Sequence, residues 1–243
     1  MKAKSILQCA ALLTGLLFLN VPLFATVESG IVGYSAVELD NMGYTILALP
    51  FSSLEATSAG YPIKNIAGDL SQSSRPARAD RIQVMDPETK AYTVYRYLTA
   101  GWVKDGESNV TEDVIKPGAS VFYYKAVSTG SVTLAGAVLP DASWTQELKQ
   151  GLNLVANPYP VEIRIADLTG SLAQSDRLAR ADKVLLMDPA TKEYTTYNFT
   201  ASTGWTKEGE SVTTTDVIPA YRGFFYRKVV SDGSLTFTSP IAQ

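Results

Sequence analysis

The residues of this chain that could do chemistry are acids that recur about a hundred positions apart. They are Asp80 and Asp182, Asp86 and Asp188, Glu107 and Glu210, and Asp113 and Asp216. Two carboxyl groups that flank a glycosidic bond can act as acid and as base or nucleophile in glycoside hydrolysis. A carboxylate-dependent hydrolase of extracellular polysaccharide is therefore one function that the sequence allows.

Each of these acids also fits a purely structural role. The pattern predicts Asp-Pro turns at Asp86 and Asp188, surface ion pairs of Arg78 with Asp80 and of Arg180 with Asp182, and hairpin tips around Glu107 and Glu210. Catalysis needs buried carboxyl groups with shifted pKa values. Because these acids are expected to be solvated, we predict no catalytic residue and no enzyme.

Chemistry that depends on histidine or a thiol is excluded. The chain has no histidine, and Cys9 is its only cysteine. Ser-His-Asp and Cys-His sites are therefore ruled out, and zinc or copper would lack their usual ligands. A phosphate-binding loop, a dinucleotide fingerprint and a calcium-binding loop are also missing from the sequence. We expect neither a metal nor a cofactor.

Aromatic residues are the more informative candidates for a binding site. Trp102 and Trp205 each follow a glycine at the start of a short strand beside a polar loop, and Tyr92 and Tyr194 precede them. Exposed Trp and Tyr rings can stack on sugar rings, so these four residues are candidate glycan-binding residues. The alternative is that each Trp closes one end of a core, with its N–H bonded to a loop carbonyl.

These residues recur because the sequence contains one unit twice. Met85-Asp86-Pro87 returns as Met187-Asp188-Pro189, and further matches keep the same order along the chain. We predict a first β unit at 26–138 and a second at 139–243, packed together without a flexible linker. Trp144 has no aromatic counterpart, since Ala36 or Val37 lies there, and we expect it to pack between the units.

The elements that must position these residues are β-strands. From Arg81 to Asp86 apolar and polar residues alternate, which is the strand period. An Asp-Pro turn then leads into a second strand from Tyr92 to Leu98, forming a hairpin. About seven strands are expected in each unit, with short helical candidates only at 63–70 and 163–172. The predicted fold class is all-β, with a sandwich or barrel-like unit repeated in tandem.

The first 25 residues are predicted to be a secretory signal peptide. Lys2 and Lys4 precede an apolar run at 7–19, and Ala25 offers a small residue for cleavage. The apolar run is shorter than the roughly 20 residues that span a bilayer. We therefore expect an exported protein, in the periplasm, at the cell surface or outside the cell, with no transmembrane segment after cleavage.

The charge of the chain limits its partners. It has 21 basic and 24 acidic residues, a net charge of −3, and no basic cluster. This composition argues against binding to nucleic acid or to anionic lipid. We expect a glycan or another component of the cell envelope as the partner.

Several short motifs resemble those of a known group of proteins. They are Gly33-Tyr-x-x-Val-Glu-Leu39, Gly43-x-x-x-Leu-x-x-Pro-Phe51, Asp80-x-Ile-x-x-Met-Asp86, Gly101-Trp102 and Ile115-Lys-Pro-Gly118. They resemble the pattern of secreted tandem-repeat β proteins of the bacterial planctomycete–verrucomicrobial group. The second copy departs from it at Asn157-Pro158-Tyr159 and Pro219-Ala220-Tyr221. The resemblance implies export and a β fold, and it implies no activity.

The leading functional hypothesis is a non-catalytic secreted or cell-surface protein with a structural, adhesive or glycan-binding role. Export and a duplication without a catalytic constellation motivate it. Two linked copies of a binding unit would also gain avidity.

Overall fold

The computed structural model describes residues 31–39, 43–54, 60–127 and 129–241. These residues form β-strands and three short 3₁₀ helices without any α-helix, so the prediction of an all-β fold is confirmed. None of the sheets that they form closes on itself. The predicted signal peptide lies outside the described residues, and within them no helix could cross a membrane.

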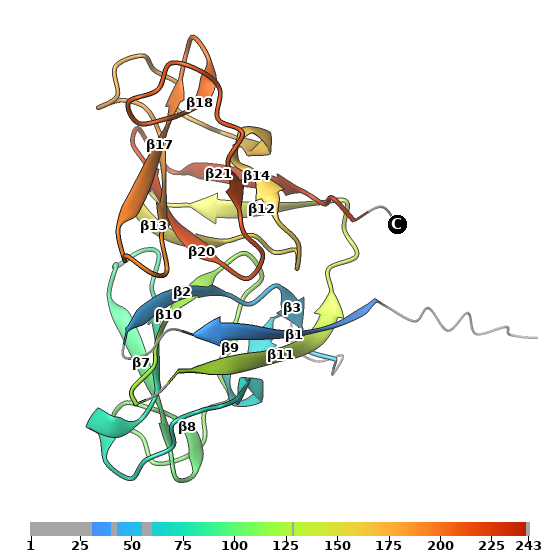
Figure 1. Ribbon diagram of the computed structural model, residues 1–243, viewed down its shortest axis with the longest axis vertical. Coiled ribbons are helices and arrows are strands. Elements are labelled where there is room, and N and C mark those ends of the chain that lie inside the picture. Colours follow the sequence, from blue (N-terminus) through green and yellow to red (C-terminus); the bar gives the residue numbers. More distant parts are fainter. Residues whose placement is uncertain (1–30, 40–42, 55–59, 128, 242–243) are drawn as a thin grey trace, which may run out of the picture.

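The N-terminal half, residues 31–138, is built from two main sheets (Figure 1). The first has five strands in the order β2 (Tyr44–Ala48), β10 (Ser120–Tyr124), β6 (Arg81–Met85), β7 (Tyr92–Leu98) and β8 (Gly101–Lys104). The second contains β1 (Val32–Leu39), β11 (Gly130–Val138), β3 (Phe51–Ser52) and β5 (Ala67–Gly68). A small ladder joins β4 (Tyr61–Pro62) to β9 (Val114–Ile115).

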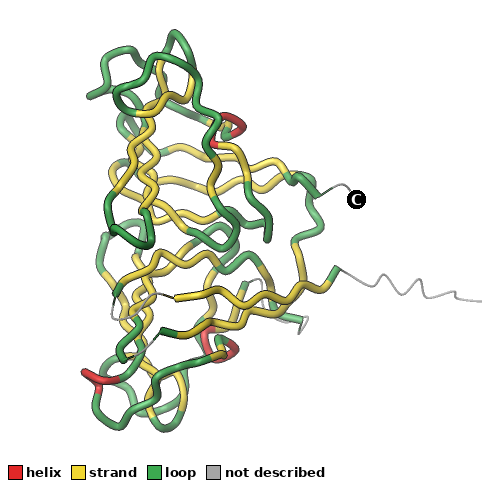
Figure 2. Tube along the Cα trace, viewed as in Figure 1, coloured by secondary structure: helices red, strands yellow, loops and turns green. Residues whose placement is uncertain are grey.

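The C-terminal half has the same strand order in its five-stranded sheet, and strands and loops make up most of both halves (Figure 2). Its five-stranded sheet runs β13 (Gly151–Ala156), β20 (Gly223–Lys228), β16 (Lys183–Met187), β17 (Tyr194–Thr200) and β18 (Gly204–Lys207). Its second sheet contains β12 (Ser143–Leu148), β21 (Gly233–Thr238) and β15 (Thr169–Gly170). The small ladder joins β14 (Ile163–Arg164) to β19 (Val217–Ile218).

Strands are more numerous and helices shorter than the sequence pattern suggested. The described residues contain eleven strands in the N-terminal half and ten in the C-terminal half, where about seven were expected in each. The excess comes from strands of two residues, which only distant partners define. The helical candidates at 63–70 and 163–172 contain single 3₁₀ turns, η1 (Ile63–Asn65) and η3 (Ile165–Asp167), and η2 (Pro76–Arg78) is the third.

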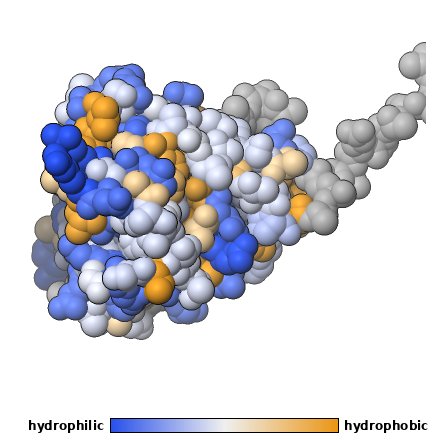
Figure 3. All heavy atoms as spheres, turned by 90° about the horizontal axis from the view of Figure 1, so that it is seen from above, coloured by the Kyte–Doolittle hydropathy of each residue, from blue (hydrophilic) through white to orange (hydrophobic). Residues whose placement is uncertain are grey.

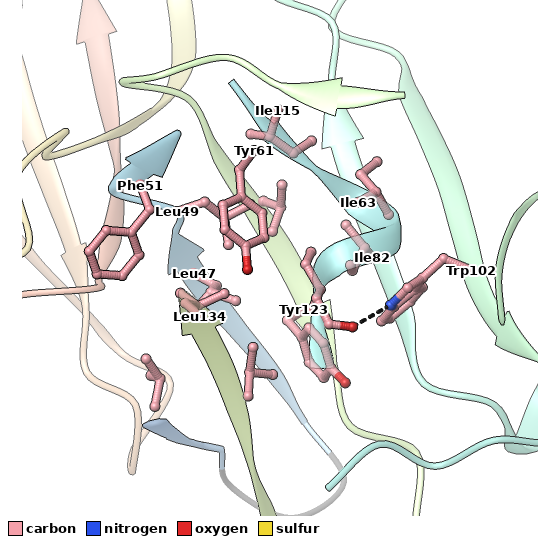
Figure 4. Packing of buried hydrophobic residues seen from close by; sticks show 14 of the residues in the cluster. Leu47, Leu49, Phe51, Tyr61, Ile63, Ile82, Trp102, Ile115, Tyr123 and Leu134 are labelled. Carbon is pink, nitrogen blue, oxygen red and sulfur yellow. Dashed lines mark hydrogen bonds between the residues drawn. The ribbon is translucent and has the colours of Figure 1, made fainter. Parts of the chain in front are cut away.

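A hydrophobic core fills the space between the two sheets of each half. In the N-terminal half, Leu47 and Tyr123 of the five-stranded sheet and Leu134 of the other sheet are fully buried in one cluster (Figure 4). Val155, Tyr226 and Phe237 belong to the matching cluster of the C-terminal half. This burial explains the alternation along the strands, because every second side chain faces the opposite sheet.

The two halves meet through their five-stranded sheets, where β2 and β10 face β13 and β20 (Figure 1). The Ala48 N–H donates to the Tyr221 carbonyl at 2.9 Å, and the Ala156 N–H donates to the Gly118 carbonyl at 2.8 Å. Ala48 matches Ala156 in the strand order, and Gly118 matches Tyr221. The two hydrogen bonds are therefore related as they would be by a two-fold axis between the halves. A third apolar cluster lies at this contact, and Ile46, Leu154 and Phe225 are buried in it.

Candidate functional site

Trp102 and Trp205 lie in the cores and not on the surface. Their exposed fractions are 1% and 2%. The Trp102 Nε1–H donates to the Ile66 carbonyl at 3.0 Å (Figure 4), and the Trp205 Nε1–H donates to the Leu168 carbonyl at 3.4 Å. Their candidacy for glycan stacking is therefore corrected, because a buried indole has no free face for a sugar. Each Trp closes its core, which was the alternative interpretation.

Tyr92 and Tyr194 lie apart from the tryptophans, at the seam between the halves. They are 44% and 42% exposed. The ring centroid of Tyr92 is 6.0 Å from Phe122, that of Tyr194 is 6.0 Å from Phe225, and those two Phe rings are 5.6 Å apart. Partial burial raises the pKa of both tyrosine hydroxyls. Both rings thus flank the contact between the halves, each with one side open to solvent.

Asp80 is fully buried, which corrects the expectation of a solvated acid paired with exposed Arg78. Its Oδ2 accepts hydrogen bonds from Lys125 Nζ at 2.9 Å, the Tyr123 hydroxyl at 2.8 Å and the Ser71 N–H at 2.9 Å. Its Oδ1 accepts the Ala126 N–H at 2.8 Å. Burial and the adjacent carboxylate raise the pKa of the Tyr123 hydroxyl.

Asp182 has the same surroundings in the C-terminal half, again correcting the expected surface ion pair. It accepts hydrogen bonds from Lys228 Nζ at 2.9 Å, from the Tyr226 hydroxyl at 3.0 Å and from the Ala173 and Val229 N–H groups at 2.8 Å each. The carboxylate accepts four hydrogen bonds in all, one of them from its ammonium partner, so its hydrogen-bonding capacity is used. Such a group ties strands together and offers no free oxygen to a substrate.

Sequence reasoning missed the two lysines that complete these clusters. Lys125 and Lys228 are buried, and each follows a buried tyrosine by two positions. Their recurrence next to the repeated Phe-Tyr pairs was visible in the sequence. Lysine is almost never fully buried unless it is paired, so recurrence alone did not suggest burial.

The remaining repeated acids are occupied as well. The Asp86 Oδ1 accepts the Glu88 and Thr89 N–H groups at 2.8 Å each, which confirms the predicted turn and lowers the Asp86 pKa. Asp113 accepts the Tyr95 hydroxyl at 2.6 Å, which lowers its pKa. Asp188 and Asp216 make the matching contacts, and Glu107 and Glu210 are exposed. Within the described residues, no three acidic side chains cluster as metal ligands would.

A cleft of about 820 Å³ opens between the two halves. One wall is the end of the β6–β7 hairpin, from Val84 to Pro87, and the loop from Val114 to Pro117. The other wall is β12, from Trp144 to Glu147. Of the repeated acids, Asp86 alone has a place on these walls, and its lowered pKa makes it unsuited to act as a general acid.

Strand β12 presents its open edge to this cleft. The Ser239 N–H donates to the Ala142 carbonyl at 2.8 Å, so alternate residues further along β12 bond to β21. The backbone groups of Thr145 and Glu147 therefore point away from β21. Among the described residues, the only side chain that reaches them is Gln146, whose Nε2 donates to the Glu147 carbonyl at 3.1 Å. The cleft thus combines apolar side chains with a row of backbone donors and acceptors.

Trp144 is the half-buried aromatic residue of this wall. Gly118, at φ +78°, lets the opposite half approach it, since a Cβ there would lie 2.7 Å from the Trp144 Nε1. That Nε1 has no hydrogen-bond partner within the described part of the chain. The pairing registers make Ser35 the counterpart of Trp144, which corrects the expected Ala36 or Val37.

At the other end of the interface, an aromatic side chain of the C-terminal half packs on the N-terminal half. Tyr221 occupies the position of Gly118 and, at φ +62°, has the same left-handed backbone. Its ring lies 6.2 Å from Phe51 and packs on the core of the N-terminal half. The glycine therefore occurs at the end with the cleft, and the tyrosine at the end where its ring packs on Phe51.

Neither sequence comparison identifies a relative: no model of a known protein family matches the chain, and no curated protein sequence matches it significantly. The interpretation of the cleft therefore rests on its geometry. A concave, mainly apolar site with a few polar groups that converge on it is the usual form of a ligand pocket.

Proposed function

We propose that this chain is an exported, non-catalytic protein that binds a glycan in the cleft between two tandem β units. In this proposal residues 1–25 are a signal peptide, and 26–138 and 139–243 are copies of one unit. Its location is the cell surface, the periplasm or the extracellular space. The observation that carries the binding function is the Trp144 wall of the 820 Å³ cleft.

The chemistry of the cleft suits a carbohydrate. A sugar ring offers a C–H face that packs on an aromatic side chain, and hydroxyls that both donate and accept hydrogen bonds. Trp144 supplies the aromatic surface, and the backbone of Thr145 and Glu147 supplies donors and acceptors at the strand spacing. Lys116 adds one positive charge, and Asp86 and Glu147 add two negative ones. This combination favours a neutral or mixed polymer over a strongly anionic one.

The proposal excludes hydrolysis because the repeated acids serve the fold. The carboxylates of Asp80 and Asp182 accept hydrogen bonds from buried ammonium and hydroxyl groups. The Asp86 carboxylate accepts hydrogen bonds from the backbone of its own turn. A retaining or inverting pair needs two available carboxyl groups roughly 5 to 10 Å apart. Incubation with any polysaccharide that binds should therefore release no reducing ends.

The decisive experiment is a binding assay on immobilised polysaccharides with the purified exported chain. We expect at least one cell-envelope polysaccharide to retain it, and Trp144→Ala to weaken that binding by about 2 kcal/mol, roughly thirtyfold. Trp144→Phe should keep part of the affinity, since it keeps an aromatic ring.

The matched control is Tyr221→Ala, which removes an aromatic side chain from the other end of the same interface. It perturbs packing between the halves, and Tyr221 itself is not part of the cleft lining, so its affinity should stay close to that of the wild type. The proposal fails if no polysaccharide retains the chain, or if Trp144→Ala and Tyr221→Ala weaken binding equally.

A further inference from the structure

The outer faces of the two five-stranded sheets carry different chemistry at matching positions. In the N-terminal half, Tyr44, Tyr124 and Arg81 lie in one row across β2, β10 and β6. The matching row of the C-terminal half is Leu152, Arg227 and Lys183, across β13, β20 and β16. One cation beside two tyrosines is thus replaced by two cations next to a leucine.

The cation of the N-terminal half is stabilised by its aromatic neighbours, although its buried Nε lacks a hydrogen-bond partner within the described residues. The Arg81 guanidinium carbon lies 4.1 Å from the centre of the Tyr124 ring and 5.3 Å from that of Tyr44. Its Nη2 also donates to the Tyr44 hydroxyl at 2.6 Å. Packing beside two aromatic rings stabilises a guanidinium without any anion, so Arg81 does not need a counter-ion.

The two cations in the row of the C-terminal half have no comparable stabilising neighbours. Lys183 and Arg227 are directly opposite on neighbouring antiparallel strands, where Cβ atoms are about 5 Å apart and like charges repel. Neither side chain has an ion pair or hydrogen bond within the described residues. Asn198, the next residue in the row, is buried, and its Oδ1 has no hydrogen-bond partner there either.

Lys183, Arg227 and Leu152 line a depression of about 430 Å³ on the sheet surface, and Leu185, Thr196 and Glu208 complete its lining. The position of Glu208 corresponds to Asp105, which pairs with Arg96 at 2.6 and 3.0 Å. Asn198 replaces that arginine, so Glu208 has lost the corresponding partner. The depression therefore offers two cations, one carboxylate, one hydroxyl and two leucine side chains.

We propose that this depression binds an acidic sugar. Lys183 and Arg227 hold its carboxylate or sulfate group, and the anion relieves their mutual repulsion. Glu208 accepts hydrogen bonds from its hydroxyls, and Leu152 and Leu185 contact the ring. No broad hydrophobic surface competes for a partner on the face seen in Figure 3, where hydrophobic patches are small and separated by hydrophilic residues. The site is independent of the cleft and does not require the cleft to bind anything.

The test measures binding of the exported chain to three polymers: polygalacturonate, dextran sulfate and neutral dextran. We expect a charged polymer to bind and dextran to bind far more weakly, with polygalacturonate and dextran sulfate distinguishing carboxylate from sulfate recognition. Lys183→Gln and Arg227→Gln should each weaken binding about tenfold. Glu208→Gln should strengthen it several-fold, because it removes a repelling charge from the depression.

The matched control is the double variant Arg177→Gln with Arg180→Gln, which removes two exposed charges from the same half, outside the depression. It should change affinity by less than about twofold, since neither arginine lines the depression and single exposed charges contribute little energy. The proposal is overturned if neither acidic polymer binds better than dextran or if this control weakens binding as much as Lys183→Gln. Loss of acidic-polymer binding in Trp144→Ala would assign the ligand to the cleft and also overturn it.

Discussion

The buried Asp80 and Asp182 clusters are nearly identical, whereas the two ends of the interface between the halves are built from different residues. Both clusters use an ammonium, a tyrosine hydroxyl and two backbone N–H groups around one carboxylate. At the interface, one end has Gly118 with Trp144 and the other has Tyr221 with Phe51. The interiors of the two halves thus use the same arrangement, and their contact surfaces differ.

This difference bears on where the proposed binding site lies. A buried charge leaves little freedom, because losing any partner exposes the others to an apolar environment. The interface ends require only that space be filled, and an aromatic side chain from either half can fill it. At the Gly118 end the filling is incomplete, and the cleft remains.

The largest expected effect comes from substituting the buried lysine of either cluster, which tests whether the two interiors are equivalent. Lys125→Met leaves the Asp80 carboxylate buried without its cation, and we expect a loss of about 3 to 5 kcal/mol in the free energy of unfolding. Lys228→Met should cost a similar amount, because its carboxylate has matching partners. Urea denaturation of each variant measures both values.

Lys104→Met is the matched control, since Lys104 pairs with Asp113 at 3.5 Å and both side chains are substantially exposed. Exposed pairs contribute about 0 to 1 kcal/mol. Equal losses in Lys125→Met and Lys104→Met would contradict the structural role of the buried cluster.

The second prediction tests the difference between the interface ends. Gly118→Ala combines backbone strain at φ +78° with a Cβ 2.6 Å from Gln146 Oε1 and 2.7 Å from Trp144 Nε1. We expect a loss of about 2 to 4 kcal/mol, the sum of strain and overpacking. Reduced glycan binding should accompany it, because the new methyl group displaces Trp144.

Gly106→Ala separates the two contributions. Gly106 has a similar backbone, at φ +89°, but a Cβ there would meet no described atom within 4 Å. Strain alone should cost about 1 to 2 kcal/mol. If Gly118→Ala costs no more than Gly106→Ala, the close approach of Trp144 to the glycine does not constrain the interface.

Local pattern was sufficient to predict the longer strands and the pairing of β6 with β7 in a hairpin, but not the two-residue strands and their distant partners. The alternation around Ile82 and Val84 and the Asp86 turn are local features, and the structure has them where expected. The two-residue strands β3, β4 and β5 exist only through pairing with β11 and β9. No window of sequence contains that information.

The candidate site was harder to predict because it forms between segments that are distant in sequence. Trp102 and Trp205 hold matching positions in the two halves, which drew attention to them, but residues that match in two halves of similar topology are those that the core requires. Trp144 has no aromatic counterpart and lies opposite a loop that precedes it by about 26 positions. In this chain the useful signal was a difference between the halves, and similarity identified the scaffold.

The smallest expected effect concerns the Tyr95 hydroxyl, which keeps the Asp113 pKa below its usual value. A carboxyl group with a lowered pKa in the folded state stabilises the fold above its unfolded pKa of about 4 and loses that contribution as the pH falls further. Tyr95→Phe should therefore cost up to about 1 kcal/mol at pH 7, given the exposure of Asp113. The difference from the wild type should shrink below pH 4.

Tyr97→Phe is the control for this titration, because the Tyr97 ring packs on Trp102 at 5.2 Å and its hydroxyl makes no hydrogen bond to a described residue. Urea denaturation at pH 7 and near pH 2.5 should show a pH-dependent loss for Tyr95→Phe and a pH-independent one for Tyr97→Phe. A loss at Tyr95 that is equal at both pH values would mean that the hydroxyl stabilises the neutral and ionised carboxyl alike. The Asp113 contact would then be a packing feature of the hairpin, without an electrostatic contribution.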